Sequence, residues 1–262
     1  FGNGWTFTTE LLFTKNINEV DWQNVNFLPQ TGLKSTGPDT RDIYPTAGAT
    51  KLTYRPTGAT SLIRNPYSNI ILIKNTQGSR GYSYNFTMQL NKETKTGLLL
   101  NAAYTYGNSS VYNEGTSSVN WQNMETVRGR NYNVRSTSDF DLGHRIYALV
   151  SKKFTYAKKH AATTVTLSYN GQSGNPFSYV YSSFSNLNAI VGDGVSANDL
   201  MYIPANRAEM DAQVFLTRLT GAAATPAANA ANIAQQKDDY EVFINSDKYL
   251  RKHRGQFAER NG

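Results

Sequence analysis

The sequence contains no cysteine and few charged residues, and both features narrow what the protein can be. Without cysteine there is no disulfide framework and no thiolate chemistry. Charged residues make up 17% of the 262 residues, below the roughly 25% usual for soluble domains. Serine, threonine, asparagine and glutamine take their place, together with 17 tyrosines and 12 phenylalanines. This composition is typical of extracellular or outer-membrane β structure.

Long hydrophobic runs are also missing. No stretch approaches the roughly 20 apolar residues of a transmembrane helix. Because a strand pattern begins near Phe1, we expect no signal peptide within these residues. The net charge of +7 raises the question of nucleic-acid binding. However, the basic residues are scattered, and the one dense segment, KYLRKHRG (248–255), matches no recognisable nucleic-acid-binding fold. We therefore expect no nucleic-acid partner.

The sequence lacks a catalytic constellation. Its three histidines, His144, His160 and His253, have no metal-ligand spacing between them. It contains neither the G-x-S-x-G turn of hydrolases nor a phosphate-binding P-loop. We therefore expect that the protein is not an enzyme.

A period of two dominates the clearest segments. In GYSYNFTMQL (81–90) the even-numbered residues from Tyr82 to Leu90 are apolar, and the residues between them are polar. Such alternation predicts a strand with one apolar and one polar face. Similar patterns predict strands near residues 4–22, 69–90, 97–107, 143–155 and 162–171.

The predicted connections are of two lengths. Residues 91–97 and 155–161 form short turns, whereas the segments 23–67, 107–143 and 172–262 are long. If 69–90 is one strand and the chain reverses at each connection, every short turn falls at one end of the sheet. Short turns at one end and long loops at the other are the signature of an outer-membrane barrel.

The predicted strands are longer than the 5–6 residues usual in soluble sheets and suit a bilayer crossing. Aromatic residues lie near both predicted ends, as in the girdles of membrane barrels. One end has Tyr82, Tyr84, Tyr104, Tyr106 and Tyr169, and the other Trp5, Phe7, Phe154 and Tyr156, with Phe86, Met88, Leu100 and Leu167 between them. We therefore predict an all-β fold, an antiparallel transmembrane β-barrel segment whose apolar face contacts lipid. Pattern alone leaves a soluble β-sandwich open.

Several motifs occur in an order known from one family. They are TKNINEVDWQNVN (14–26), GYSYNFTMQLNK (81–92), AAYTYG (102–107), SDFDLGHRI (138–146), GQSGNPFSYVY (171–181), GDGVSANDLMYIP (192–204) and YLRKHRGQFAERNG (249–262). Together they resemble the C-terminal part of the barrel of TonB-dependent outer-membrane receptors. The resemblance is to the Oar-like branch of Bacteroidota and Myxococcota, which bears a carboxypeptidase-regulatory domain.

This resemblance implies a 22-stranded barrel in the outer membrane, closed by an N-terminal plug and energised by the TonB complex through a short N-terminal box. It also implies an unknown ligand bound at extracellular loops, and a surface lipoprotein as a further partner. We find neither plug nor box in the sequence, so we expect residues 1–262 to be part of one barrel domain, without the plug and the barrel C-terminus. Two alternatives remain. One is an outer-membrane protein of adhesion or secretion that transports nothing, and the other is a soluble extracellular β-sandwich binding module.

Three segments of the last long loop are candidate sites. In VGDGVSANDL (191–200), oxygen ligands that suit calcium are Asp193, Asn198 and Asp199. The alternative is that these residues form Asx-turns, which would only organise the loop; no other cofactor is expected. The aromatic segment 175–184 suits contact with a sugar or peptide ligand through Phe177, Tyr179, Tyr181 and Phe184, or else the cover of a neighbouring loop.

The third candidate is a cationic end of the loop, formed by Lys248, Arg251, Lys252 and Arg254, with Arg260. It would face an acidic ligand, lipopolysaccharide phosphates or the plug, unless it is a solvated helix face. Residues 221–236 are low in complexity and are predicted to be mobile. A helical pattern follows, which predicts short helices with Ser246 as an N-cap and Gly255 as a stop.

Overall fold

The structure of the protein is a computed structural model, which describes residues 3–25, 34–35, 37–44, 70–76, 81–115, 124–181, 190–193, 195, 198–212 and 225–262. The chain divides into two compact units. Unit 1 comprises Phe1–Glu19, Thr76–Glu114 and Arg135–Pro176, and unit 2 comprises Val20–Asn75, Gly115–Val134 and Phe177–Gly262. Each unit is assembled from segments that lie far apart in the sequence.

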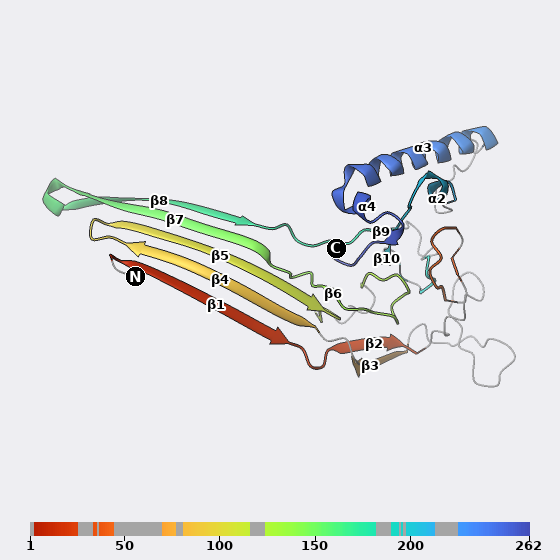
Figure 1. Cartoon of the computed structure of the whole chain (residues 1–262), viewed down its shortest axis with the longest axis horizontal. Coiled ribbons are helices and arrows are strands. Elements are labelled where there is room, and N and C mark those ends of the chain that lie inside the picture. Colours follow the sequence, from red (N-terminus) through yellow and green to blue (C-terminus); the bar gives the residue numbers. More distant parts are fainter. Residues whose placement is uncertain are drawn as a thin grey trace. The chain divides into compact units, whose positions relative to one another are not determined.

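Unit 1 is an antiparallel sheet of long strands that lie side by side (Figure 1). In spatial order the strands are β1 (Trp5–Lys15), β4 (Tyr82–Glu93), β5 (Leu98–Val111), β7 (Gly143–Tyr156) and β8 (Ala161–Gln172). The short β6 (Ser136–Thr137) pairs with the end of β5. The structure is mostly antiparallel sheet with few helices, which confirms the all-β prediction. In the described part of the chain β1 and β8 are the sheet edges, and no closed barrel is seen.

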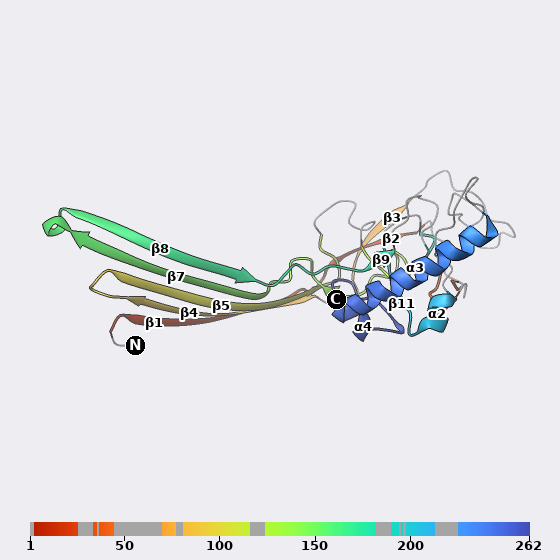
Figure 2. The same ribbon diagram turned by 90° about the horizontal axis from the view of Figure 1, so that it is seen from above.

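The strand connections of unit 1 differ between the two ends of the sheet, and the view in Figure 2 shows the two hairpins that close one end. Between β4 and β5, the Gly97 N–H donates to the Thr94 carbonyl at 3.0 Å, and Gly97 has a φ of 77° that favours glycine. Between β7 and β8 lies the 3-10 turn η1 (Ala157–Lys159), whose three residues all have positive φ. At this end, the start of β1 also lies beside Glu93, because the Glu93 N–H donates to the Gly4 carbonyl at 3.2 Å.

Two predicted strands need correction. The predicted strand 4–22 is divided between β1 of unit 1 and β2 (Val20–Asn24) of unit 2. The predicted strand 69–90 is likewise divided between β3 (Ile71–Asn75) and β4, which pair with β2 and β1 respectively. Both short turns nevertheless lie at one end of the sheet, because β1, β4, β5, β7 and β8 still alternate in direction.

The buried carboxylate of Glu19 explains where the first pair of strands breaks. It accepts hydrogen bonds from the Gly81 N–H at 2.7 Å, the Asn16 side-chain amide at 3.1 Å and the Tyr112 N–H at 3.2 Å. Backbone donors are thereby bound to a side chain at this point instead of to a neighbouring strand. A buried charge that accepts several N–H groups is well satisfied, so the interruption is stable.

Besides β2 and β3, which overlap predicted strands, unit 2 contains regular elements where the sequence suggested only long loops and short helices. Strand β2 pairs with β3, β9 (Val180–Tyr181) with β10 (Asp199–Leu200), and β11 (Tyr202–Ile203) with β12 (Gln256–Phe257). The helices are α2 (Arg207–Asp211), α3 (Pro226–Ser246) and α4 (Lys248–Lys252). The main core is buried and consists of Met201, Ile203, Met210, Ile244, Leu250 and Ala258.

Helix α3 begins at Pro226 and runs for 21 residues, so residues 226–236 of the low-complexity segment are helical, whereas residues 221–224 lie outside the described residues. The Thr225 hydroxyl accepts the Ala228 N–H at 3.2 Å, and Pro226 occupies the first turn. Both features favour helix initiation, and the alanines that follow have the highest helix propensity. The next helix is capped by Asp247, whose carboxylate accepts the Leu250 N–H at 2.9 Å, and not by Ser246.

Candidate functional site

The most distinctive feature of unit 1 is that the strand register gathers the apolar residues on one face of the sheet. Phe7 pairs with Leu90, Leu90 with Ala102, Ala102 with Ala148, and Ala148 with Tyr169. Because side chains alternate between the two faces along each strand, this row determines on which face of the sheet each remaining strand residue lies. The apolar face consists of Trp5, Phe7, Leu11 and Phe13 of β1, the even-numbered residues of β4, β5 and β7, and the odd-numbered residues of β8.

The apolar face is open. Met88 and Leu90 are 39% and 38% exposed, and Leu167 is 74% exposed. Among the exposed large apolar residues of these five strands, Leu12 and Leu99 alone lie on the opposite face. A soluble sandwich would instead bury Tyr82–Leu90 against a second sheet.

The opposite face is polar, and its side chains bond to one another across the strands. The hydroxyls of Thr87 and Thr105 lie 3.1 Å apart, and those of Ser151 and Thr166 lie 2.9 Å apart. Asn91 accepts hydrogen bonds from the side-chain amides of Gln89 and Asn101. Such a face is suited to water, so the two faces of the sheet suit different solvents.

The register places the predicted aromatic residues of both sheet ends on the apolar face. Tyr104 and Tyr106 lie toward the end that carries the long connections, and Phe154 and Tyr156 lie next to the β7–β8 turn. At the turn end, the Lys92 ammonium also lies 4.4 Å from the centroid of the Trp5 ring. Aromatic and basic side chains thus flank a largely aliphatic middle.

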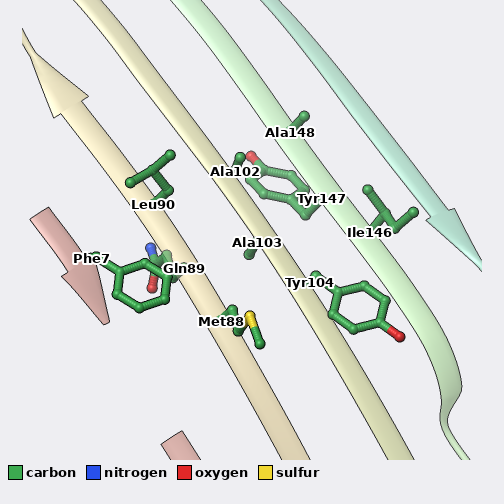
Figure 3. Close-up of a pocket in the computed structure, with 10 residues that line it drawn as sticks. All are labelled: Phe7, Met88, Gln89, Leu90, Ala102, Ala103, Tyr104, Ile146, Tyr147 and Ala148. Carbon is green, nitrogen blue, oxygen red and sulfur yellow. The ribbon is translucent and has the colours of Figure 1, made fainter. Parts of the chain in front are cut away.

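A groove of about 320 Å³ crosses this aliphatic middle (Figure 3). The small side chains of Ala102 and Ala148 face each other on β5 and β7. The larger residues around them come from four neighbouring strands and include Phe7, Met88, Leu90, Tyr104 and Ile146. The groove exists because two alanines pair in a row that otherwise carries bulky side chains.

In unit 2 the predicted ligand-binding aromatics have mostly structural contacts. Tyr179 and Tyr181 pack against the main core. The Tyr181 hydroxyl donates to the Tyr202 carbonyl at 3.0 Å, and burial raises its pKa well above the usual range. Phe177 is 58% exposed and lies edge-on to Tyr179 at 5.1 Å, whereas Phe184 lies outside the described residues. These contacts favour the alternative role, in which the segment covers other loops.

The predicted calcium ligands Asp193, Asn198 and Asp199 lie close together and are buried. The Asp193 carboxylate accepts the backbone N–H groups of Arg130 at 3.2 Å and Val195 at 3.0 Å, and the Asn198 side-chain amide at 3.2 Å. The Arg130 guanidinium also lies 3.9 Å from it. A carboxylate surrounded by donors and a cation has little capacity left for a metal ion. The contacts therefore favour loop organisation, and calcium binding stays a prediction.

Asp199 differs from Asp193 because one of its carboxylate oxygens, Oδ1, is buried without a hydrogen-bond partner. The other, Oδ2, accepts the Ile190 N–H at 2.6 Å and the Val191 N–H at 3.4 Å. Burial, and next the charge of Asp193, raise the pKa of Asp199 to about 6. This carboxyl group titrates in the folded protein under mildly acidic conditions.

A buried ion pair between Asp39 and Arg41 was not foreseen. Their side chains are fully buried, and Arg41 Nη2 lies 2.7 Å from Asp39 Oδ2 and donates to the Leu200 carbonyl at 2.6 Å. The Arg41 guanidinium also lies 5.0 Å from the centroid of the Phe257 ring. The pair thereby ties a segment near residue 40 to elements near residues 200 and 257.

The predicted cationic end does not form a single surface. Arg254 forms an ion pair with Glu241 and donates to the Pro204 carbonyl at 3.2 Å, while Arg260 is buried. Lys248, Arg251 and Lys252 are exposed on the five-residue helix α4. Only these last three fit the solvated helix face that was the alternative interpretation.

Within the described ranges no helix has the length and apolar character to cross a membrane, and no group of three or more acidic or histidine side chains is placed to hold a metal ion. Comparison of the chain with protein-family models, with curated proteins and with solved structures found no match.

Proposed function

We propose that the chain forms part of the wall of an outer-membrane β-barrel, with unit 2 built from its extracellular loops. The barrel would belong to a TonB-dependent receptor that binds a ligand at its outer surface for energised uptake. The observation that carries the proposal is the open apolar face, continuous over five strands and backed by a polar face. Lipid is the solvent that suits the first face, and a water-filled lumen suits the second.

Strand length and connection length support the same proposal. The five strands contain 11–14 residues each, which is enough for the roughly 9–11 that a tilted strand needs to cross a bilayer. The short turns would face the periplasm and the longer connections the outside. Because an unpaired strand edge is not tolerated in lipid, the proposal requires further strands beside β1 and β8.

The assignment to a TonB-dependent receptor, and with it the TonB complex and a surface lipoprotein as partners, rests on the sequence motifs. An adhesive or secretory barrel would have the same wall. A plug domain encoded in the same reading frame would favour uptake over these roles.

Arginine substitutions on adjacent residues of β8 test the lipid-facing wall. Leu167 lies on the apolar face and Ser168 on the polar face, both near the middle of the strand. Leu167→Arg is expected to destabilise the protein in phospholipid vesicles by about 2–4 kcal/mol, the cost of arginine near the bilayer midplane. Ser168→Arg, the matched control, is expected to assemble as the wild type does. Urea midpoints in vesicles and recovery from outer-membrane fractions provide the readout; equal behaviour of the two variants would contradict the proposal.

A further inference from the structure

The groove over Ala102 and Ala148 lies close to a concentration of lysines at the turn end of the sheet. The two segments that form this end, residues 91–97 and 152–160, contain Lys92, Lys95, Lys152, Lys153, Lys158 and Lys159, with Glu93 as their sole acidic residue. Glu93 and Lys153 belong to the polar face, whereas Lys92 and Lys152 belong to the apolar face. Positive charge therefore lies beside apolar surface.

The two lysines of the apolar face are held near the level of the turns. Lys152 Nζ donates to the Thr96 carbonyl at 2.8 Å, and the Lys92 ammonium lies over the Trp5 ring. A lysine ammonium has three N–H donors, so each keeps donors for a further acceptor. Tryptophan and lysine together are typical of the membrane–water interface.

The spacing along the strands lies within the depth of one leaflet. Lys92 follows Leu90 by two residues, and Lys152 follows Ala148 by four, which corresponds to about 7 Å and about 13 Å along a strand. Half of a hydrocarbon core is about 15 Å thick. A lipid whose phosphate lies at the lysines would therefore have its acyl chain at the depth of the two alanines.

We propose that this groove and these lysines hold one anionic phospholipid, with an acyl chain over Ala102 and Ala148 and the headgroup phosphate at Lys92 and Lys152. The proposal rests on the lipid-facing wall proposed above. Zwitterionic lipids would fill the same groove less tightly, since their headgroups carry a cation toward the lysines. Charge complementarity thus selects the occupant.

The test is a titration of the full-length protein in detergent with phosphatidylglycerol or phosphatidylcholine of identical chains, with bound lipids counted by native mass spectrometry. We expect phosphatidylglycerol to bind more tightly. Lys92→Gln and Lys152→Gln should each weaken phosphatidylglycerol about 5-fold, as expected for one lysine at an anionic headgroup, and leave phosphatidylcholine unchanged. Ala148→Leu, which fills the groove, should weaken both lipids.

Two control variants isolate the site. Lys15→Gln removes a lysine at the opposite end of β1, and Leu11→Phe enlarges an exposed residue of the apolar face outside the groove; both should bind lipid as the wild type does. Equal affinity for the two lipids, or lysine variants that match Lys15→Gln, would overturn the proposal. If Leu167→Arg still impairs membrane assembly in that case, the lipid site alone has failed. If Leu167→Arg and Ser168→Arg assemble equally, the lipid-facing wall has failed.

Discussion

In unit 2, contacts of single buried residues hold the long loop segments together. Glycine- and asparagine-rich segments offer little apolar surface to bury, so buried polar contacts carry part of the organisation. Arg41, which is paired with Asp39, donates to the distant Leu200 carbonyl, and Asp193 accepts the N–H of the distant Arg130. Such contacts stabilise only when both partners are present, because a lone buried charge is costly.

Removal of the Asp39 carboxylate tests this dependence. Asp39→Ala leaves Arg41 buried without its counter-ion and is expected to lower the free energy of unfolding of unit 2 by about 3–5 kcal/mol. Asp42→Ala removes a more exposed carboxylate, which pairs with the exposed side chains of Lys34 and Arg128, and should cost about 1 kcal/mol or less for each pair. Urea unfolding followed by tyrosine circular dichroism measures both. If both variants lose a similar free energy of unfolding, the buried pair contributes no more to stability than the exposed pairs.

The raised pKa of Asp199 predicts a pH dependence of stability. The folded protein holds this proton to a pKa of about 6, whereas the ordinary value is 3.8. Between these values the folded state binds more protons than the unfolded state, so the stability of unit 2 should fall as the pH rises from 4 to 6. Asp199→Asn should flatten this slope. Parallel stability curves for the wild type and the variant over that range would refute the role of Asp199.

Among the elements, helix α3 shows most clearly how the loop-borne core is built. Its residue Ile244 is fully buried in the main core, and Tyr240 packs against the same cluster. Phe243 and Val242 remain exposed, the latter at 68%. The side of the helix that contains Tyr240 and Ile244 therefore contributes most of its packing against the core.

Truncation of two neighbouring residues of α3 tests this packing. Ile244→Ala removes buried apolar volume and should cost about 2–5 kcal/mol. Val242→Ala removes an exposed side chain and should change stability by about 0.5 kcal/mol or less. The two free energies of unfolding, measured in urea, should differ by about 1.5 kcal/mol or more; equal values would place Ile244 outside the core.

The strands of unit 1 could be predicted from the sequence, but much of unit 2 could not. Period-two alternation is a local signal, and it identified β4, β5 and β8 with the correct facing of Met88 and Leu167. The break at Glu19 depends on Gly81 and Tyr112, more than 60 residues away, so no local pattern reveals it. Thr225 followed by Pro226 was an available helix-start signal that low complexity concealed.

The candidate site was also predicted only in part from the sequence. Sequence pattern predicted which residues of unit 1 face together, because alternation fixes a face once the register is known. It did not predict the groove, which depends on Ala102 and Ala148 meeting across two strands. It grouped Asp193, Asn198 and Asp199 correctly, yet Arg130 comes from another segment and changes what that group can bind.

At the scale of the whole molecule, the proposed function requires the two faces of the unit 1 sheet to meet different solvents. Lipid on the apolar face and water on the polar face would explain the aromatic ends, the strand length and the short turns together. A soluble protein with this sheet would have to cover a large apolar surface.

The most direct measurement is spin-label accessibility at two adjacent residues of β4, which the absence of cysteine in this chain makes simple. Met88→Cys places a label on the apolar face, and Gln89→Cys places one on the polar face. In phospholipid vesicles, we expect the label at 88 to be relaxed by oxygen, which concentrates in lipid, and the label at 89 by a water-soluble nickel chelate. A label at 88 that is shielded from both reagents, or as open to the chelate as the label at 89, would contradict the account.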